Sequence, residues 1–112
     1  MHIIFNREAA EELGKKFTVL ELETFEVDGK ILECFCVVPA ERVLNDMHNL
    51  PEYVELHRTF LDFYRQNDNE RTLHYGRLLM GKFGGELDSF YEILMDRIKT
   101  WNSARIQNLH LA

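Results

Sequence analysis

Two glutamates and two cysteines alternate within a stretch that predicts a pair of β-strands. Glu21 and Glu23 lie on the first predicted strand, and Cys34 and Cys36 lie on the second. Pairing through a two-residue turn would place all four side chains on one face of the hairpin. Thiolates and carboxylates are zinc ligands, but a flat strand surface does not converge four ligands on one point. We therefore favour half-buried thiols beside solvated carboxylates, and predict no metal and no cofactor.

The two cysteines are also poor candidates for nucleophilic catalysis. A reactive thiol needs a basic neighbour or a helix N-terminus that lowers its pKa, whereas the neighbours expected here are acidic. A disulfide between residues at i and i+2 would distort the strand. We expect reduced thiols, which are typical of a cytoplasmic protein.

Of the five histidines, His57 is the one that falls on a strong apolar stripe, within a predicted helix over residues 52–65. The histidine spacings match no common metal-binding motif. A general base would need a polar pocket around His57. A hydrogen-bonded histidine in the core or at its boundary is the more frequent situation, and we favour it. No catalytic residue is predicted.

A glycine pair, Gly84-Gly85, precedes the last predicted helix. Helix N-termini can bind anions, but the Lys-Ser/Thr pair of a P-loop does not follow these glycines. Glu86 and Asp88 occupy the positive end of the helix instead. The glycines are better explained as the end of one helix and a tight turn into the next.

The elements that would position these residues form an α+β domain. Asp28-Gly29 between two β-rich runs is a strong hairpin signal. The first residues, 2–5, could add a third strand. Helical periodicity fills the chain after Pro39. We predict an antiparallel β-hairpin packed on a bundle of four to five helices.

The chain has 112 residues, which indicates a single domain, 1–112. Its parts are a strand, a helix and the hairpin in 1–38 and a helical part in 39–101. Residues 102–112 either extend the last helix or fray. The hairpin register predicts that Glu21 faces Cys36, Leu20 faces Val37 and Leu22 faces Phe35, which makes Leu20, Leu22, Phe35 and Val37 the core face.

The net charge of −6 disfavours general binding to nucleic-acid backbones. Four arginines recur in the central helices, either as a basic stripe for an acidic partner or RNA, or as a solvated face with ion pairs. Interleaved acidic residues favour the ion pairs. These four arginines are Arg58, Arg65, Arg71 and Arg77.

No apolar run approaches the length of a membrane span, so we expect no membrane contact.

Two resemblances extend these expectations. The segment FLDFYRQNDNERTLHYGRLLMGKF resembles one helical hairpin of the tetratricopeptide type, within the predicted helices of residues 52–101. The pieces FTVLELETF and GKFGGELDSFY resemble stretches of small uncharacterised proteins of tailed phages. That resemblance implies an accessory protein acting on a host or viral partner.

Together these observations predict a non-enzymatic protein–protein interaction module that forms a homodimer. The expected partner-binding residues are apolar ones without an obvious partner inside the chain, on the second hairpin face and in the C-terminal segment. The alternative is a small enzyme or ligand-binding domain, with a pocket between hairpin and helices lined by His57, Tyr64, Glu21 or Cys36. The expected partner-binding residues are Phe25, Leu32, Trp101, Ile106, Leu109 and Leu111.

Overall fold

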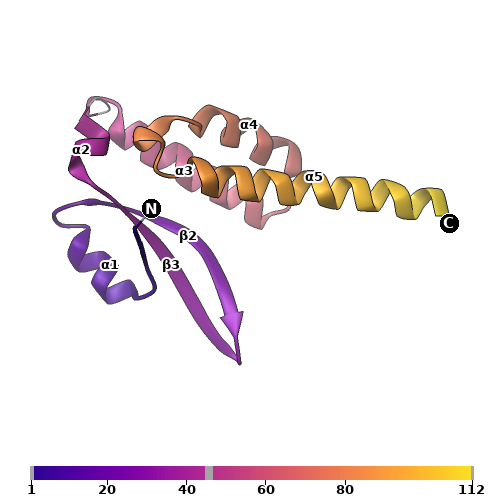
Figure 1. Ribbon diagram of the computed structural model, residues 1–112, viewed down its shortest axis with the longest axis horizontal. Helices are drawn as coiled ribbons and strands as arrows, with labels where there is room; N and C mark the ends of the chain where they lie inside the picture. Colours follow the sequence, from indigo (N-terminus) through magenta and orange to yellow (C-terminus); the bar gives the residue numbers. More distant parts are fainter. Residues whose placement is uncertain (1, 45–46, 112) are drawn as a thin grey trace.

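A three-stranded antiparallel sheet lies against a group of helices, and a short helix follows the first strand (Figure 1). The computed structural model describes residues 2–44 and 47–111, with side chains described as far as Thr100. The strands are β1 (His2–Ile4), β2 (Thr18–Val27) and β3 (Lys30–Val38), arranged in the order β1-β3-β2. The helices are α1 (Arg7–Leu13), α2 (Ala40–Val43), α3 (Leu50–Arg65), α4 (Asn69–Leu79) and α5 (Asp88–Leu111), with a 3-10 turn η2 (Lys82–Gly85) before α5. The predicted α+β fold and its third strand are confirmed.

The hairpin turn forms where the sequence predicts it. Asp28 and Gly29 both have positive φ angles, 51° and 77°. Two successive residues with positive φ define the type I′ turn, whose twist matches the twist of the strands. Val27 therefore pairs with Lys30, and Phe25 pairs with Leu32.

A β-bulge in β2 changes the register beyond this point. The pairing shifts between Glu21 and Thr24, so that Glu21 lies opposite Phe35 and Leu20 lies opposite Cys36. The predicted pairings of Glu21 with Cys36, Leu20 with Val37 and Leu22 with Phe35 are therefore wrong. The physical reason is that one extra residue in one strand moves every later pair by one position.

The bulge also changes which side chains share a face of the sheet. Because directly opposed residues point to the same side, Glu21 lies on the face of Phe35, away from the two cysteines. The predicted four-residue cluster on one face is wrong. The predicted core face is right for Leu20 and Leu22 and wrong for Phe35 and Val37, which lie on the opposite face. The face that packs on the helices, here called the inner face, carries Leu20, Leu22, Cys34, Cys36 and Val38, all buried.

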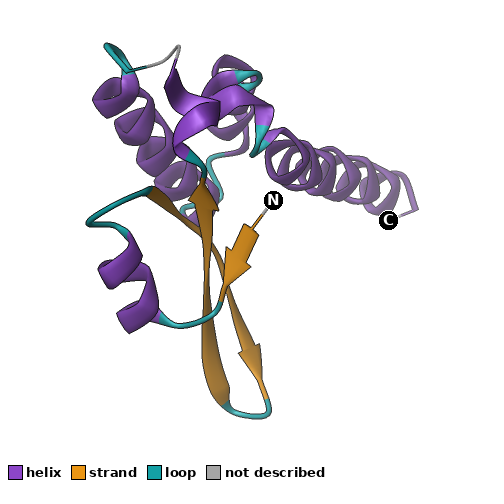
Figure 2. Ribbon diagram, turned by 60° about the vertical axis from the view of Figure 1, so that its left-hand side comes forward, coloured by secondary structure: helices purple, strands orange, loops and turns teal. Residues whose placement is uncertain are grey.

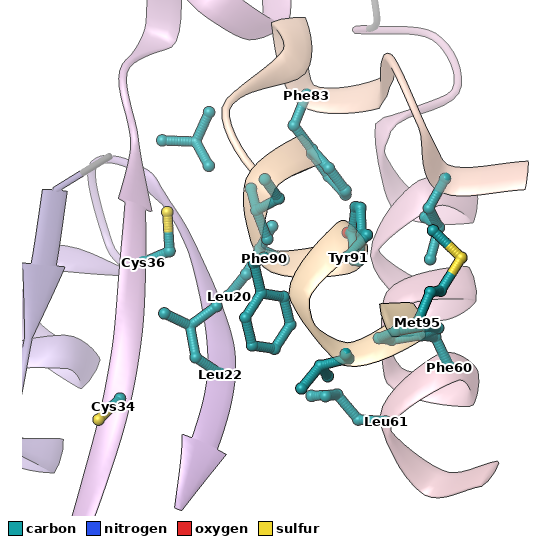
Figure 3. Close-up of a cluster of buried hydrophobic side chains, with 14 of the residues drawn as sticks. Leu20, Leu22, Cys34, Cys36, Phe60, Leu61, Phe83, Phe90, Tyr91 and Met95 are labelled. Atoms are coloured by element: carbon teal, nitrogen blue, oxygen red, sulfur yellow. The ribbon is translucent and has the colours of Figure 1, made fainter. Parts of the chain in front are cut away.

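The core lies between the inner face and the helices α3, α4 and α5 (Figure 3). Phe60, Phe83 and Tyr91 are fully buried there, and the rings of Phe60 and Tyr91 meet edge to face at 5.2 Å. The opposite face of the sheet carries Phe35 and packs on α1, which stands apart from the other helices (Figure 2). The sheet is therefore covered on both sides, but by helices of different length.

The last helix continues to Leu111, so residues 102–111 extend α5. In Figure 1, α5 runs beyond α3 and α4, and the turn of the hairpin projects in another direction. Among the described side chains, Ile98 is the last buried one on α5.

Gly84 allows the backbones of η2 and α2 to lie in close contact. Its φ is +64°, and a Cβ there would lie 2.6 Å from the carbonyl oxygen of Arg42. We predict that Gly84→Ala lowers the free energy of unfolding by about 2–4 kcal/mol, through left-handed strain and a backbone clash. Urea denaturation followed by circular dichroism measures the change.

Gly81 provides the matched control. Its φ is +83°, but a Cβ at Gly81 would meet no atom within 4 Å. Gly81→Ala should cost only the left-handed strain, about 1 kcal/mol. Equal losses in the two variants would contradict a close contact between η2 and α2.

Candidate functional site

His57 links three elements inside the core. Its Nε2 lies 2.6 Å from the backbone oxygen of Glu21 on β2, and its Nδ1 lies 2.8 Å from the hydroxyl of Tyr91 on α5. A carbonyl oxygen only accepts hydrogen bonds, so Nε2 carries the proton and donates it. Nδ1 then accepts a hydrogen bond from the Tyr91 hydroxyl. Both ring nitrogens are used, in a single tautomer.

Burial keeps this pair of side chains uncharged. It lowers the pKa of His57 to about 4, although the hydrogen bond to Glu21 acts in the opposite direction. Burial likewise raises the pKa of the Tyr91 hydroxyl. The lone pair of His57 that a general base would use is occupied by Tyr91. The prediction of a hydrogen-bonded core histidine is confirmed.

A cleft of about 270 Å³, lined by apolar and charged side chains, lies beside this network, between α1, β2 and α3. Arg7, Arg58 and Arg65 line it, and each makes an ion pair with a glutamate. Arg65 contacts Glu21 at 2.8 Å, which ties α3 to the edge strand. The predicted pairing with interleaved acidic residues is confirmed for Arg58, which pairs with Glu55, and for Arg71, which lies 3.6 Å from Asp68, whereas Arg65 pairs with Glu21 of β2.

The two cysteines are buried and free. Burial raises the pKa of Cys36 to about 11, and burial together with the nearby Glu23 carboxylate raises the pKa of Cys34. Within the described part of the chain, no three His, Cys, Asp or Glu side chains come close enough to hold a metal ion. Both thiols therefore act as small apolar core groups.

The glycine pair before α5 belongs to a turn that uses its own polar groups. Phe83 has a φ of 55° and fills the core, while Gly84 and Gly85 also have positive φ angles. The Asp88 carboxylate accepts a hydrogen bond of 2.8 Å from the backbone N–H of Gly81. This arrangement agrees with the predicted tight turn between helices.

An apolar groove of about 230 Å³ runs between the open end of the inner face and α5. Several large side chains in it remain exposed: Phe5 by 60%, Ile93 by 52%, and Ile3 and Phe25 by 43% each. Contiguous exposed apolar side chains are typical of a binding surface. The groove is lined by Ile3, Phe5, Leu22, Glu23, Phe25, Cys34, Phe90, Ile93, Leu94 and Arg97.

An ion pair closes one side of the groove. Arg97 on α5 donates a hydrogen bond to the Glu23 carboxylate and lies 3.5 Å from the Tyr64 hydroxyl. Glu23 is one of the two residues that the bulge places opposite Cys34. The β-bulge that sets the register of the sheet therefore also positions Glu23 at the side of the groove.

The sequence-predicted partner-binding residues fall into two groups. Phe25 lines the groove, and Leu32 pairs with Phe25 and is partly exposed on the same face. The other residues lie on the last part of α5, where side chains are outside the described residues: Trp101, Ile106, Leu109 and Leu111.

Sequence reasoning missed Ile3, Phe5 and Ile93 as members of the groove. Ile93 carried a usable signal, because it lies off the apolar stripe of its helix and has no intramolecular reason to be apolar. Ile3 and Phe5 carried none, because only the tertiary fold brings the N-terminal strand beside α5.

The comparisons with known proteins found nothing similar: no family model, no curated protein and no solved structure matches this chain. Among the helices that the structure describes, none has the length and apolar character needed to cross a membrane. Function is therefore inferred from the surfaces of the chain itself.

The buried His57 makes stability depend on pH. The unfolded chain binds a proton at His57 below pH 6.5, whereas the folded chain does so only near pH 4. The stabilisation is complete above pH 6.5 and is lost as the pH falls from 6.5 to 4, a total on the order of 3 kcal/mol. Urea denaturation at several pH values measures this loss.

The comparison of two histidine variants isolates the effect from carboxylate titration. His57→Gln should be less stable at pH 7 and should lack this part of the pH dependence. His74→Gln, at an exposed position on α4, should retain it. Parallel pH profiles for the wild type and His57→Gln would contradict a neutral buried imidazole.

The thiols should react slowly in the folded protein. Because both are buried and protonated at neutral pH, we predict that alkylation by iodoacetamide is at least about 100-fold slower than in urea. Mass spectrometry over time measures both rates. Rapid labelling of either thiol in the native protein would show that the inner face opens.

Proposed function

We propose that this chain is a non-enzymatic protein–protein interaction module that docks its partner in the apolar groove. The observation that carries the proposal is the gathering of exposed Phe5, Phe25 and Ile93 from three separate segments in one concave surface. Scattered exposed apolar residues are ordinary, whereas a contiguous set marks a site that gains free energy when covered.

The partner that we propose is a second copy of the chain, which forms a homodimer with two-fold symmetry. Two-fold dimers are the commonest soluble oligomers, and each copy then covers the same surface of the other. The proposed setting is the cytoplasm, where the free thiols stay reduced. The resemblance to small tailed-phage proteins supports an accessory role in such a phage, with the dimer acting on a host or viral partner.

The alternative, a small enzyme or ligand-binding domain, would use the cleft beside His57. The contacts there favour a structural role. Both nitrogens of His57 are hydrogen-bonded, and Arg58 and Arg65 are already paired with glutamates. In the apolar groove, by contrast, Phe5 and Ile93 remain exposed to solvent.

Ile93→Glu tests the groove as a docking surface. A carboxylate at this position would have to lose its water when the groove is covered, and Arg97, the cation that lines the groove, is already paired with Glu23. We predict that the dimer dissociation constant rises at least tenfold, measured by size exclusion with light scattering over a range of concentrations.

Leu78→Glu is the matched control. Leu78 lies on α4, is 46% exposed, and does not line the groove. This variant should dimerise like the wild type. A wild-type chain that is monomeric at high concentration, or equal weakening by both substitutions, would contradict self-association through the groove.

A further inference from the structure

We propose that the occupant of the groove is the C-terminal part of α5, residues 99–111, supplied by the second copy. Each chain would insert this segment, here called the α5 extension, into the groove of its partner. This inference rests on the proposed function, because it names the part of the second copy that covers the groove.

The length of α5 provides the first argument. Ile98 is its last buried side chain among those described, yet the helix continues to Leu111. Those thirteen residues add about 20 Å of helix at 1.5 Å per residue. Figure 1 shows this part of the helix running past α3 and α4. A helical segment of this length is marginal in water unless it packs on something.

The sequence of the α5 extension provides the second argument. It contains Trp101, Ile106 and Leu109. Helical periodicity puts Trp101 on the stripe of Leu94 and Ile98, which are buried in the core. The apolar pattern of α5 therefore continues beyond the body of the chain that covers it. A second copy offers a groove of matching apolar character.

Charge complementarity provides the third argument. Lys99 and Arg105 give the α5 extension two positive charges, and it contains no Asp or Glu. The hairpin beside the groove, residues 18–38, has five acidic residues against Lys30 alone. Of these five only Glu23 lines the groove, where Arg97 is paired with it, so the attraction on a basic helix comes from the summed charge of the hairpin and acts at longer range. This asymmetry between the two surfaces favours the chain's own extension over an acidic peptide.

A two-fold axis can satisfy both copies at once. If two α5 helices cross antiparallel near Thr100, residue 107 of one copy lies beside Ile93 of the other, because each is seven positions from the axis. The side of the α5 extension that carries residues 100 and 107 then lies on the partner's α5 at Ile93, and the opposite side, which carries position 109, lies toward the hairpin wall of the groove. The same axis returns the extension of the second copy to the first, and the assembly closes as a dimer.

The size of this interface agrees with a stable dimer. The groove has ten lining residues, and the α5 extension has thirteen. A standard interface uses roughly 20–30 residues from each partner. The groove alone would be too small, so reciprocal exchange is what makes self-association through it sufficient.

Disulfide trapping of the full chain tests the placement of the axis. Thr100 is exposed, and Thr100→Cys should give a disulfide-linked dimer under mild oxidation, because a disulfide needs Cα atoms within about 7 Å. Glu92→Cys is the control on the same helix. Two copies of residue 92 would lie about 24 Å apart in this arrangement and should not link. The native cysteines are buried and should not interfere.

Leu109→Glu adds an equilibrium measurement. Position 109 lies beyond the last described buried side chain, so unchanged urea denaturation at low protein concentration would show that the monomer stays folded. We expect the dimer dissociation constant to rise at least tenfold. An unchanged constant, or linking through Glu92→Cys in place of Thr100→Cys, would overturn the α5 extension as occupant.

The outcomes separate this inference from the proposed function. A dimer that Ile93→Glu disrupts, but that neither Leu109→Glu weakens nor Thr100→Cys traps, keeps the groove as docking surface and removes the α5 extension from it. A wild-type monomer at all concentrations overturns both proposals. Trapping through Thr100→Cys together with loss of dimer in Leu109→Glu supports both.

Discussion

The position of the sheet on the helices depends on the two hydrogen bonds of His57. β2 is an edge strand, and backbone groups along such an edge lack a strand partner. Burying one of them against a helix is costly unless a donor satisfies it. His57 supplies that donor to the Glu21 carbonyl and accepts a hydrogen bond from Tyr91 in return. One side chain on α3 therefore ties the edge of the sheet to α5, and this requires a neutral imidazole.

The bulge next to Glu21 distributes the charges of the hairpin between two helices. In a regular strand, Glu21 and Glu23 would point to the same face. With one extra residue between them, Glu21 turns to Arg65 on α3, and Glu23 turns to Arg97 on α5. Each of these ion pairs is at least partly open to solvent and contributes little alone. Together with His57, however, they select one docking position for the hairpin, and they leave Cys34 and Cys36 in the core.

Sequence reasoning succeeded where a feature is local. The Asp28-Gly29 turn is set by two residues that tolerate positive φ, and the long helices follow from their apolar periodicity. It failed at the bulge, because Leu22 and Glu23 carry no distinguishing residue type, and only packing against α3 and α5 decides where the extra residue stands. The inference that Phe25 and Leu32 share a face needed only the turn, so it survived this error.

The groove is open because the hairpin is longer than the part of it that the helices cover. At about 3.3 Å per residue, the ten residues of β2 span roughly 33 Å. Helices α3 and α5 bury the half that contains Leu20 and Leu22, and α1 covers Phe35 behind it. Toward the turn, Phe25 and Leu32 extend beyond this cover. The helix α5 extends beyond α3 and α4 in another direction. Such a domain has an uncovered apolar strand surface and an uncovered helix end. In a two-fold dimer, the helix end of each copy can pack on the strand surface of the other, so no further element is needed to cover either.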